Sequence, residues 1–482
     1  MTGGMVMNEN PGALVPELLL LGSAVVGLLL GAWSPRHRQY LVRRLAVAAA
    51  AAGLVATVVA AGQPDQVVFG TSYAVDTLTT ATRAIVLVAL LLALALSVYA
   101  TAGHPRETEF VVLLQLGALG SMLLGGANDL LLLFAAFLLA SVPFYALAGW
   151  DRQPLGVEAA MKYYLTGAFL GVTMLTGTVL LYGVGRSTAY APLRDGLAVA
   201  PAAVVAVGLV ALLAGLAFKI GAVPAHFWVP DVTDGTLPAV AAIVTTLPKI
   251  GGLVATYRLL LVAVPPDAVD WPLLIAVLAA ASMTLGNLAA FFQTSVQRLL
   301  AYSTISQVGY LLMAVAVAAT TDLAQPALLL YLAAYAITNL GAFAVVAELP
   351  HARTIDDYRG AARRHPVLVA ALVVCLLGLI GTPPTAVFVG KLTVFTAAVD
   401  GGYAWLAVLA VVNTVASVFY YLRWIAPAFR RDDTDRDVAE PRLVPAGRWS
   451  AVAAVTAAVL AVALGILSGL VLPLLSGSPT AG

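Results

Sequence analysis

Long apolar runs alternate with short polar connectors from one end of the chain to the other. A helix needs about 20 apolar residues to cross the hydrocarbon of a bilayer, because each backbone amide and carbonyl must be bonded within its own segment. Fourteen such runs lie near residues 13–32, 45–61, 80–100, 109–126, 128–149, 158–182, 198–223, 238–263, 272–291, 299–319, 326–348, 367–396, 403–425 and 449–475. The pattern predicts an all-α integral membrane protein with about 14 transmembrane helices.

The connectors carry charge unevenly. No basic residue precedes the first run, and Arg36 and Arg38 follow it, so we expect this run to be retained as a span and not cleaved as a signal. Connectors after the odd-numbered runs contain eighteen Lys and Arg residues, and those on the other side contain only Arg83, Arg186, Arg194 and Arg258. Positive loops stay in the cytoplasm, so both termini are expected on the non-cytoplasmic side. Asp76 and Asp129 are expected at that surface as residues that begin helices.

Composition narrows the class of protein further. The chain has 482 residues, of which 61% are hydrophobic and 10% are charged, and its net charge is +1. An ordinary soluble domain has about 25% charged residues, so a soluble protein is excluded, and no basic surface indicates nucleic acid. Lipid is the expected surrounding. The single cysteine, Cys375, is too few for a disulfide, a thiolate zinc site or an iron–sulfur cluster, and we expect it to be a small buried apolar residue.

Three lysines lie within the apolar runs, where burial of a charge costs free energy. The chain has twenty-one arginines and only four lysines, and Lys219, Lys249 and Lys391 fall inside apolar runs. An intramembrane charge costs about 2.5–3.5 kcal/mol on insertion scales, so a functional role is the first hypothesis. Arginine stays charged, whereas a desolvated lysine can exchange its proton near neutrality, which suits proton transfer. A lysine that snorkels from a helix end is the alternative.

Helix-breaking residues lie next to two of these lysines. Lys219 lies two residues before Gly221 and five before Pro224, and Lys391 follows Pro383 and Pro384 by a few residues. Interrupted backbone at membrane depth is tolerated inside protein or beside a water-filled cavity. The two breaks share the pattern Ile-Gly-x-x-Pro and lie 160 residues apart, which indicates two internal copies of one unit and, within them, a transport path.

Five segments together carry a family resemblance: 158–169, 218–235, 247–249, 298–310 and 381–391. In this order they resemble the antiporter-like membrane subunits of respiratory complex I, and among those the chain is most similar to subunit N of bacterial NADH-quinone oxidoreductase. The resemblance implies fourteen helices, broken helices 7 and 12, two inverted five-helix repeats, and proton translocation through buried lysines and water.

The resemblance also implies how the chain is divided. A three-helix segment would cover residues 1–108, and the two five-helix repeats would cover 109–263 and 272–425. A cytoplasmic loop at 426–448 and a C-terminal helix at 449–482 would complete the chain.

Family positions can be carried over residue by residue. Lys219 matches the lysine of the broken seventh helix, Lys249 the connecting lysine of the eighth, and Lys391 the lysine of the broken twelfth. His226 matches the motif beyond the first break, where it would relay protons or serve as a hydrogen-bonded structural histidine. The family's fifth-helix glutamate is missing, because the alignment puts Leu138 at its position. This departure puts full pumping in doubt and suggests a divergent or second-copy subunit.

The motifs that are missing indicate that this chain is one subunit of a larger enzyme. The sequence has no dinucleotide-binding glycine motif, no P-loop and no cysteine cluster, so no cofactor is expected on this chain. NADH, flavin, iron–sulfur and quinone sites would lie on other subunits. The predicted function is therefore that of a non-redox membrane-arm subunit in the cytoplasmic membrane of a bacterium, with other membrane-arm subunits and the lipid bilayer as partners. A subunit of a multisubunit cation/proton antiporter, or a structural subunit that does not pump, is the alternative.

Overall fold

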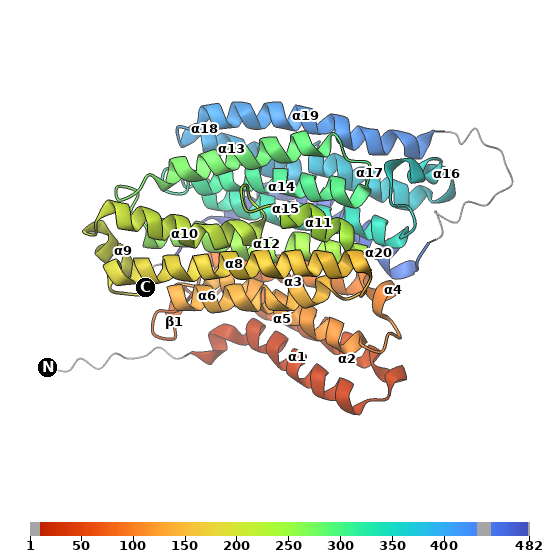
Figure 1. Cartoon of the computed structure of the whole chain (residues 1–482), viewed down its shortest axis with the longest axis horizontal. Coiled ribbons are helices and arrows are strands. Elements are labelled where there is room, and N and C mark those ends of the chain that lie inside the picture. Colours follow the sequence, from red (N-terminus) through yellow and green to blue (C-terminus); the bar gives the residue numbers. More distant parts are fainter. Residues whose placement is uncertain (1–9, 431–444, 481–482) are drawn as a thin grey trace.

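Helices with roughly parallel axes make up most of the described chain, which comprises residues 10–430 and 445–480 of this computed structural model (Figure 1). The first part consists of η1 (Pro11–Leu14), α1 (Val15–Trp33), η2 (Arg36–Arg38), α2 (Tyr40–Ala60), the antiparallel strands β1 (Gln66–Val68) and β2 (Tyr73–Val75), α3 (Thr77–Leu96) and α4 (Val98–Thr101). It continues with α5 (Glu107–Gly126), α6 (Leu130–Leu139), α7 (Val142–Ala148), α8 (Pro154–Gly185), α9 (Tyr190–Ala198), α10 (Ala202–Ile220), α11 (Trp228–Gly235) and α12 (Pro238–Arg258).

The second part begins with the π-helical turn η3 (Leu259–Ala263). It then contains α13 (Trp271–Ala290), α14 (Val296–Ala316), α15 (Ala324–Glu348), η4 (Ile355–Tyr358), α16 (Ala361–Arg364), α17 (Pro366–Ile380), α18 (Ala386–Asp400), α19 (Ala404–Phe429), α20 (Arg448–Ile466), α21 (Ser468–Val471) and η6 (Leu472–Leu475). Part of the predicted loop at 426–448 lies outside the described residues.

The all-α membrane prediction is confirmed. Thirteen helical segments of the described ranges are long and apolar enough to cross a membrane. They correspond to thirteen of the fourteen predicted runs. The remaining run, 367–396, is divided between α17 and α18, each 15 residues long. The run at 128–149 likewise contains two helices, α6 and α7, although together they count as one span.

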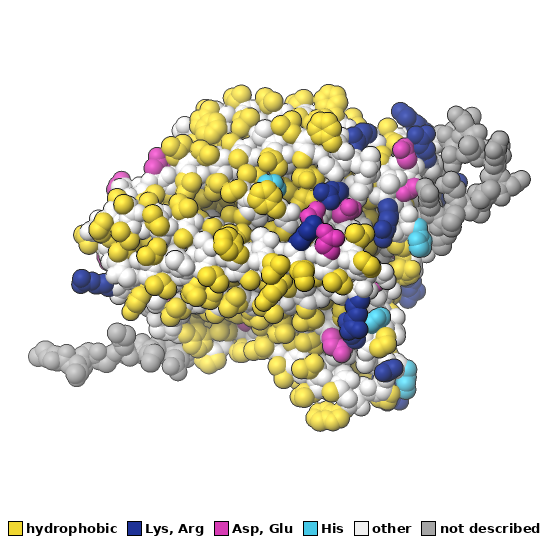
Figure 2. Space-filling view, viewed as in Figure 1, with side chains coloured by type: hydrophobic (Ala, Val, Ile, Leu, Met, Phe, Trp, Pro, Cys, Tyr) yellow, Lys and Arg dark blue, Asp and Glu magenta, His cyan; other side chains and the backbone are white. Residues whose placement is uncertain are grey.

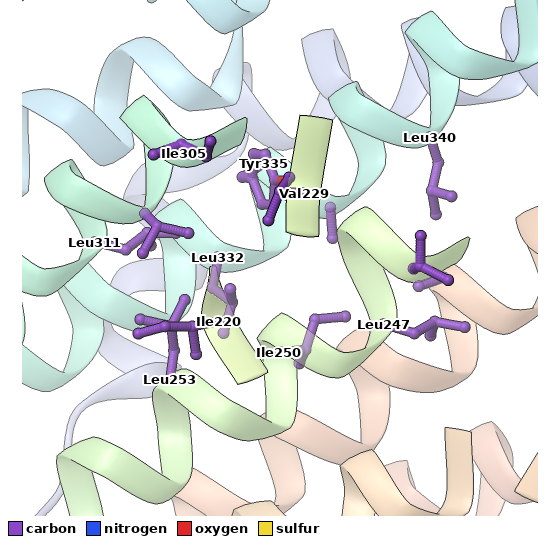
Figure 3. Packing of buried hydrophobic residues seen from close by; sticks show 14 of the residues in the cluster. Ile220, Val229, Leu247, Ile250, Leu253, Ile305, Leu311, Leu332, Tyr335 and Leu340 are labelled. Atoms are coloured by element: carbon purple, nitrogen blue, oxygen red, sulfur yellow. The ribbon is translucent and has the colours of Figure 1, made fainter. Parts of the chain in front are cut away.

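Burial separates a central layer of helices from a lipid-facing ring. In their most apolar windows α12, α14 and α15 are 100%, 94% and 89% buried, whereas α8 is only 33% buried. Figure 3 shows apolar side chains of these three helices around the ends of α10 and α11, among them Leu247, Ile305 and Leu332. Hydrophobic side chains cover most of the lateral face in Figure 2, and most of the Lys and Arg side chains visible there lie toward the end that carries α4 and α16.

Several charged residues lie deeper than predicted. The prediction that Arg43, Arg83 and Arg258 belong to connectors is wrong, because they lie within α2, within α3 and at the end of α12. Each is buried and pairs with a carboxylate from another part of the chain: Arg43 with Glu107, Arg83 with Glu17, and Arg258 with Asp76. Asp76 and Asp129 do begin helices, α3 and α6. They are only 3% and 8% exposed, so both are buried where these helices begin, and their side of the membrane stays a prediction.

Candidate functional site

The three intramembrane lysines are all buried in the bundle. Lys219 lies in the last turn of α10, Lys249 in the middle of α12, and Lys391 near the start of α18, with exposed fractions of 1%, 0% and 3%. Burial of an ammonium group is costly unless other groups bond it. The surroundings of each lysine therefore decide what it can do.

Lys219 is held by neutral oxygens. Its Nζ donates to the carbonyl oxygens of Phe137, at 3.2 Å, and Ala140, at 3.1 Å, and to the hydroxyl of Ser141. The same Nζ lies 4.3 Å from the centroid of the Phe137 ring, on whose face a cation is attracted. Three oxygens thus match the three donors of an ammonium group, and we call them the oxygen cage.

The oxygen cage exists because α6 and α7 are separate helices. α6 ends at Leu139 and α7 begins at Val142, with Pro143 in its first turn. Proline has no amide hydrogen and disrupts helical bonding before it, so carbonyls in the preceding turn lose their usual donors. The Ser141 amide bonds the carbonyl of Leu138 instead of that of Phe137. The carbonyl of Ala140 and that of Phe137, which also accepts from the Ser141 hydroxyl, are both within reach of Lys219.

Leu138 does not face this lysine. Its side chain is 43% exposed, whereas the oxygens that contact Lys219 come from Phe137, Ala140 and Ser141. The residues that contact Lys219 are therefore chain neighbours of Leu138 and not Leu138 itself, and the matching of Leu138 to a family glutamate stays a prediction. Pro143 was the sequence signal that predicts carbonyl acceptors at this position.

Lys249 has different surroundings. It follows Pro248 inside α12, and its Nζ has no hydrogen-bond partner among the described residues. It lies against the end of α10, since a Cβ added to Gly221 would be 3.1 Å from this Nζ. Gly252, on the same helix, packs closely against the side chain of Lys219. The helices α10 and α12, which carry Lys219 and Lys249, thus pack directly against each other.

Lys391 is bonded at the end of a helix. Its Nζ donates to the carbonyls of Leu379, at 3.3 Å, and Ile380, at 2.9 Å, in the last turn of α17. Free carbonyls and the negative end of a helix dipole favour a cation at this place. The Tyr310 ring lies below the amine, with its centroid 4.3 Å from Nζ.

Polar side chains connect the region of Lys249 with that of Lys391. Asn339 donates to the hydroxyls of Thr245 and Thr246, which lie about one turn before Lys249, and the Tyr335 hydroxyl contacts Thr304 at 3.1 Å. One turn further along α14, Gln307 donates to the carbonyl of Leu379, which Lys391 also contacts. We call the three lysines and these connecting side chains the lysine line.

The interrupting residues lie between pairs of helices. Gly221 and Pro224 fall between α10 and α11, and Pro383 and Pro384 fall between α17 and α18. Gly221 and Gly381 have φ angles of +73° and +91°, which suit glycine. The peptide bonds before Pro224 and Pro384 are cis.

His226 is near the first interruption but apart from the lysines. It is 7% exposed, its ring centroid lies 4.7 Å from that of Phe227, and its Nδ1 has no partner in the described part of the chain. Among these residues no hydrogen bond joins it to the lysine line. Its roles as a relay and as a structural residue both stay predictions.

The fold and these buried lysines define a class, the antiporter-like membrane proteins. A family model described as NADH:quinone oxidoreductase/Mrp antiporter, TM, matches residues 127–417, more than half of the chain. Two curated relatives narrow the class. NADH-quinone oxidoreductase subunit N 1 of Streptomyces griseus is 63% identical over 475 residues, covering 98% of this chain and 100% of the relative. Subunit N of Mycobacterium sp. (strain JLS) is 49% identical, covering 95% and 97%. The chain belongs to the family of NADH-quinone oxidoreductase subunit N.

Solved structures agree with this assignment. A chain of respiratory complex I from Thermus thermophilus, solved with bound aureothin, superposes with a TM-score of 0.82 at 34% identity, covering 96% of this chain and 100% of that one. A chain of the Mrp complex from Dietzia sp. DQ12-45-1b gives a TM-score of 0.84 at 22% identity and covers 97% and 96%. The second likeness shows a shared fold.

Proposed function

We propose that this chain moves protons across the cytoplasmic membrane of a bacterium as part of a proton-translocating, translocase-type NADH-quinone oxidoreductase. The observation that carries the proposal is the lysine line, in which three buried lysines lie on α10, α12 and α18 inside an apolar bundle. Lys249 packs against the end of α10, and buried polar side chains lie between its helix and the Leu379 carbonyl that Lys391 contacts. Isolated charges at this depth are costly, and a row of them in a membrane protein is typical of an ion pathway.

The three lysines differ in the number of oxygen atoms that contact their amines. Lys219 contacts three oxygen acceptors, Lys391 contacts two, and Lys249 contacts none among the described residues. A proton that moves along the lysine line therefore passes between sites of different stability. In the proposed mechanism a proton leaves one amine as another arrives, and threonine and tyrosine hydroxyls with water carry it between lysines.

The chain supplies no redox centre in this proposal. NADH, flavin, iron–sulfur clusters and quinone are assigned to other subunits, because a single cysteine cannot hold a cluster. The loops at 33–44 and 349–366 are assigned to the cytoplasm, and both termini to the opposite side, on the distribution of basic residues. Bonds from Asn10 to Gln66 and from Thr480 to Asp76 place both described chain ends near the β1–β2 end of the bundle, in agreement with this topology.

Cysteine labelling tests this orientation. In a Cys375→Ser background, Asp356→Cys in η4 should react with an impermeant maleimide only in inverted vesicles. Val199→Cys, at an 88% exposed position near the other end, should react only in intact cells or right-side-out vesicles. The reverse pattern would show that the topology is inverted.

Proton flux tests the function. Complexes carrying Lys249→Ala or Lys391→Ala, reconstituted into vesicles, should translocate fewer protons per NADH oxidised than the wild type. Lys162→Ala, which removes the fourth lysine, a half-exposed surface residue paired with Glu158 and Asp231, is the matched control and should change nothing. An unchanged proton yield in Lys391→Ala contradicts the proposal and favours a structural subunit. Flux driven by an added sodium gradient without NADH would favour the antiporter alternative.

A further inference from the structure

The connection between α1 and α2 is basic and contains no acidic residue. Arg36, His37 and Arg38 form η2, and Arg44 follows in the second turn of α2. Residues 18–64 contain neither aspartate nor glutamate. The side chains of Arg36, Arg38 and Arg44 are exposed, and we call these three arginines the basic corner.

No carboxylate of the described residues forms an ion pair with the basic corner. Several other basic side chains on the described surface differ in this respect, since Lys162 and Arg298 pair with Asp231, and Arg359 pairs with Asp356. Like charges without a counter-charge leave a positive potential at the surface. The basic corner therefore attracts anions from outside the described chain.

The start of α2 adds to this positive potential. Gln39 precedes the helix without a side-chain cap bond, and no acidic residue lies in the first turn. The Oε1 atom of Gln39 is buried and has no hydrogen-bond partner within the described ranges. The neighbouring helix α5 begins at the same end, as the Arg43–Glu107 pair shows, and it has two glutamates in its first turn. The positive end of a helix favours an anion, and α2 supplies none of its own.

Aromatic and apolar side chains place the basic corner at the boundary of the hydrocarbon. Trp33, at the end of α1, is 82% exposed, and Tyr40, at the start of α2, is 44% exposed. Such aromatic rings concentrate at the level of the lipid headgroups. The guanidinium carbon of Arg44 lies 4.7 Å from the centroid of the Tyr40 ring, which holds its charge at this level. One or two turns deeper, the exposed side chains of Leu29 and Val47 offer an apolar surface to acyl chains.

The basic corner also lies at the edge of the molecule. In Figure 1, α1 and the start of α2 lie at the margin of the bundle, and the turn between them projects on the side of α4. Lys, Arg and His side chains are visible at this corner in Figure 2. Only 39% of the most apolar window of α1 is buried, and the same holds for the helical segment that contains α2. A phospholipid can therefore reach the arginines with its headgroup while its chains lie beside the two helices.

We propose that the basic corner binds the phosphate groups of anionic phospholipids. The leaflet that supplies them, the cytoplasmic one, follows from the topology proposed above, but the binding itself does not depend on it. Arginine presents a planar fork of donors that bonds two phosphate oxygens at once. Each basic residue beside an anionic membrane surface strengthens binding about fivefold, so three arginines strengthen it on the order of 100-fold. The bound lipid neutralises the basic corner and holds the adjoining ends of α1 and α2 at the level of the headgroups.

Site-specific crosslinking tests the lipid contact. The intact complex, with benzoyl-phenylalanine in place of Trp33, is reconstituted into phosphatidylcholine vesicles that contain a minority of phosphatidylglycerol, and mass spectrometry identifies what is crosslinked to the subunit. Phosphatidylglycerol should be enriched at least about fivefold over its share of the vesicle lipid. Arg36→Gln, Arg38→Gln and Arg44→Gln together should return the crosslinked lipid to the vesicle composition. An enrichment that is absent, or that the three substitutions leave unchanged, overturns the proposal, and so does crosslinking to another protein subunit in place of lipid.

A second connector provides the matched control. Arg353→Gln, Arg359→Gln and Arg363→Gln remove three exposed arginines from residues 349–366, a stretch that also contains acidic residues such as Asp356. The enrichment at the probe should then stay as it was. An equal loss in this control variant would show that the net charge of the whole face recruits the lipid, which contradicts a site at the basic corner.

Ionic strength gives a further readout. Raising the salt concentration from about 0.1 M to about 1 M shortens the Debye length from about 10 Å to about 3 Å, so the enrichment should fall. An enrichment that does not change with salt contradicts an electrostatic headgroup contact. These outcomes are separate from those of the proposed function: a normal proton yield in Lys391→Ala would refute the proton pathway and leave the lipid site standing, and absent enrichment would do the reverse.

Discussion

Neutral oxygens surround the amine of Lys219, and no carboxylate of the described residues bonds it. A carboxylate and a set of neutral dipoles can both stabilise an ammonium group. Neutral dipoles, however, add no net negative charge to the site. The oxygen cage depends on the Ser141 hydroxyl and on two carbonyls that the α6–α7 interruption makes available. At the scale of single residues, the α6–α7 interruption thus supplies the oxygens that bond the amine of Lys219.

Substitution of Ser141 tests the contribution of its hydroxyl. Ser141→Ala removes one of three acceptors, and a hydrogen bond to a charged group contributes about 1.5–3 kcal/mol, so we expect fewer protons translocated per NADH. Ser141→Thr keeps a hydroxyl and should keep most of the yield. If Ser141→Ala and Ser141→Thr both behave as the wild type in reconstituted vesicles, the hydroxyl has no part in proton transfer.

The helices that carry the lysines are shaped by glycine and proline at their interruptions. Gly221 and Gly381 adopt left-handed backbone conformations, and both lie directly against a lysine side chain. A Cβ on Gly381 would be 2.9 Å from Lys391 Cδ, and one on Gly221 would be 3.1 Å from Lys249 Nζ. At the scale of elements, each interruption therefore both ends a helix and makes space for an amine.

Substitutions of two glycines distinguish backbone strain from loss of the space beside the amine. Gly381→Ala should lower the stability of the subunit, since a left-handed residue with a Cβ costs about 1–2 kcal/mol, and should also lower proton yield by displacing Lys391. Gly402, between α18 and α19, has a φ of +85° with nothing within 4 Å of an added Cβ. Gly402→Ala should show the same strain in thermal unfolding of the purified complex while pumping normally. Equal pumping by the two variants would show that the space beside Lys391 is unimportant.

A buried ion pair joins distant parts of the whole molecule. The guanidinium of Arg258, at the end of α12, makes bonds of 2.8 Å and 2.7 Å to the carboxylate of Asp76 at the start of α3. The backbone amide of Thr480 donates to the same carboxylate. One side chain thus connects the N-terminal helices, the central helix and the C-terminal tail. Burial raises the pKa of Asp76, but the charge and hydrogen bonds of Arg258 outweigh it and lower the pKa to about 2.

The pH dependence of stability follows from this shift. A carboxyl with a lowered pKa stabilises the fold fully above its ordinary value of 3.8, and the contribution is lost as the pH falls from there to about 2. The contribution is about 2 kcal/mol. Asp76→Asn should destabilise the subunit by about 3–5 kcal/mol at neutral pH, because Arg258 is left unpaired, and this deficit should shrink below pH 3. Thermal unfolding of the purified complex at several pH values measures both effects.

A second variant isolates the unpaired charge. Adding Arg258→Met to Asp76→Asn removes the buried charge while Asn keeps the helix cap, so most of the lost stability should return. No recovery in the double variant would mean that the pair holds the three segments together by more than charge compensation.

The sequence by itself determined the membrane class, the positions of nearly all the helices, the three lysines and the interruptions beside them. These features depend on local hydrophobicity and on residue types such as proline, whose effects act within a few residues along the chain. Only the tertiary structure decided the partners of the buried charges, because those contacts join residues far apart in sequence. Lys219 and Ser141 are 78 positions apart, and Arg258 and Asp76 are 182 apart. The contacts of Ser303 with Tyr421 and of Asn287 with Tyr420 were undetectable for the same reason, because these residues on α13, α14 and α19 meet only when packing brings the three helices together.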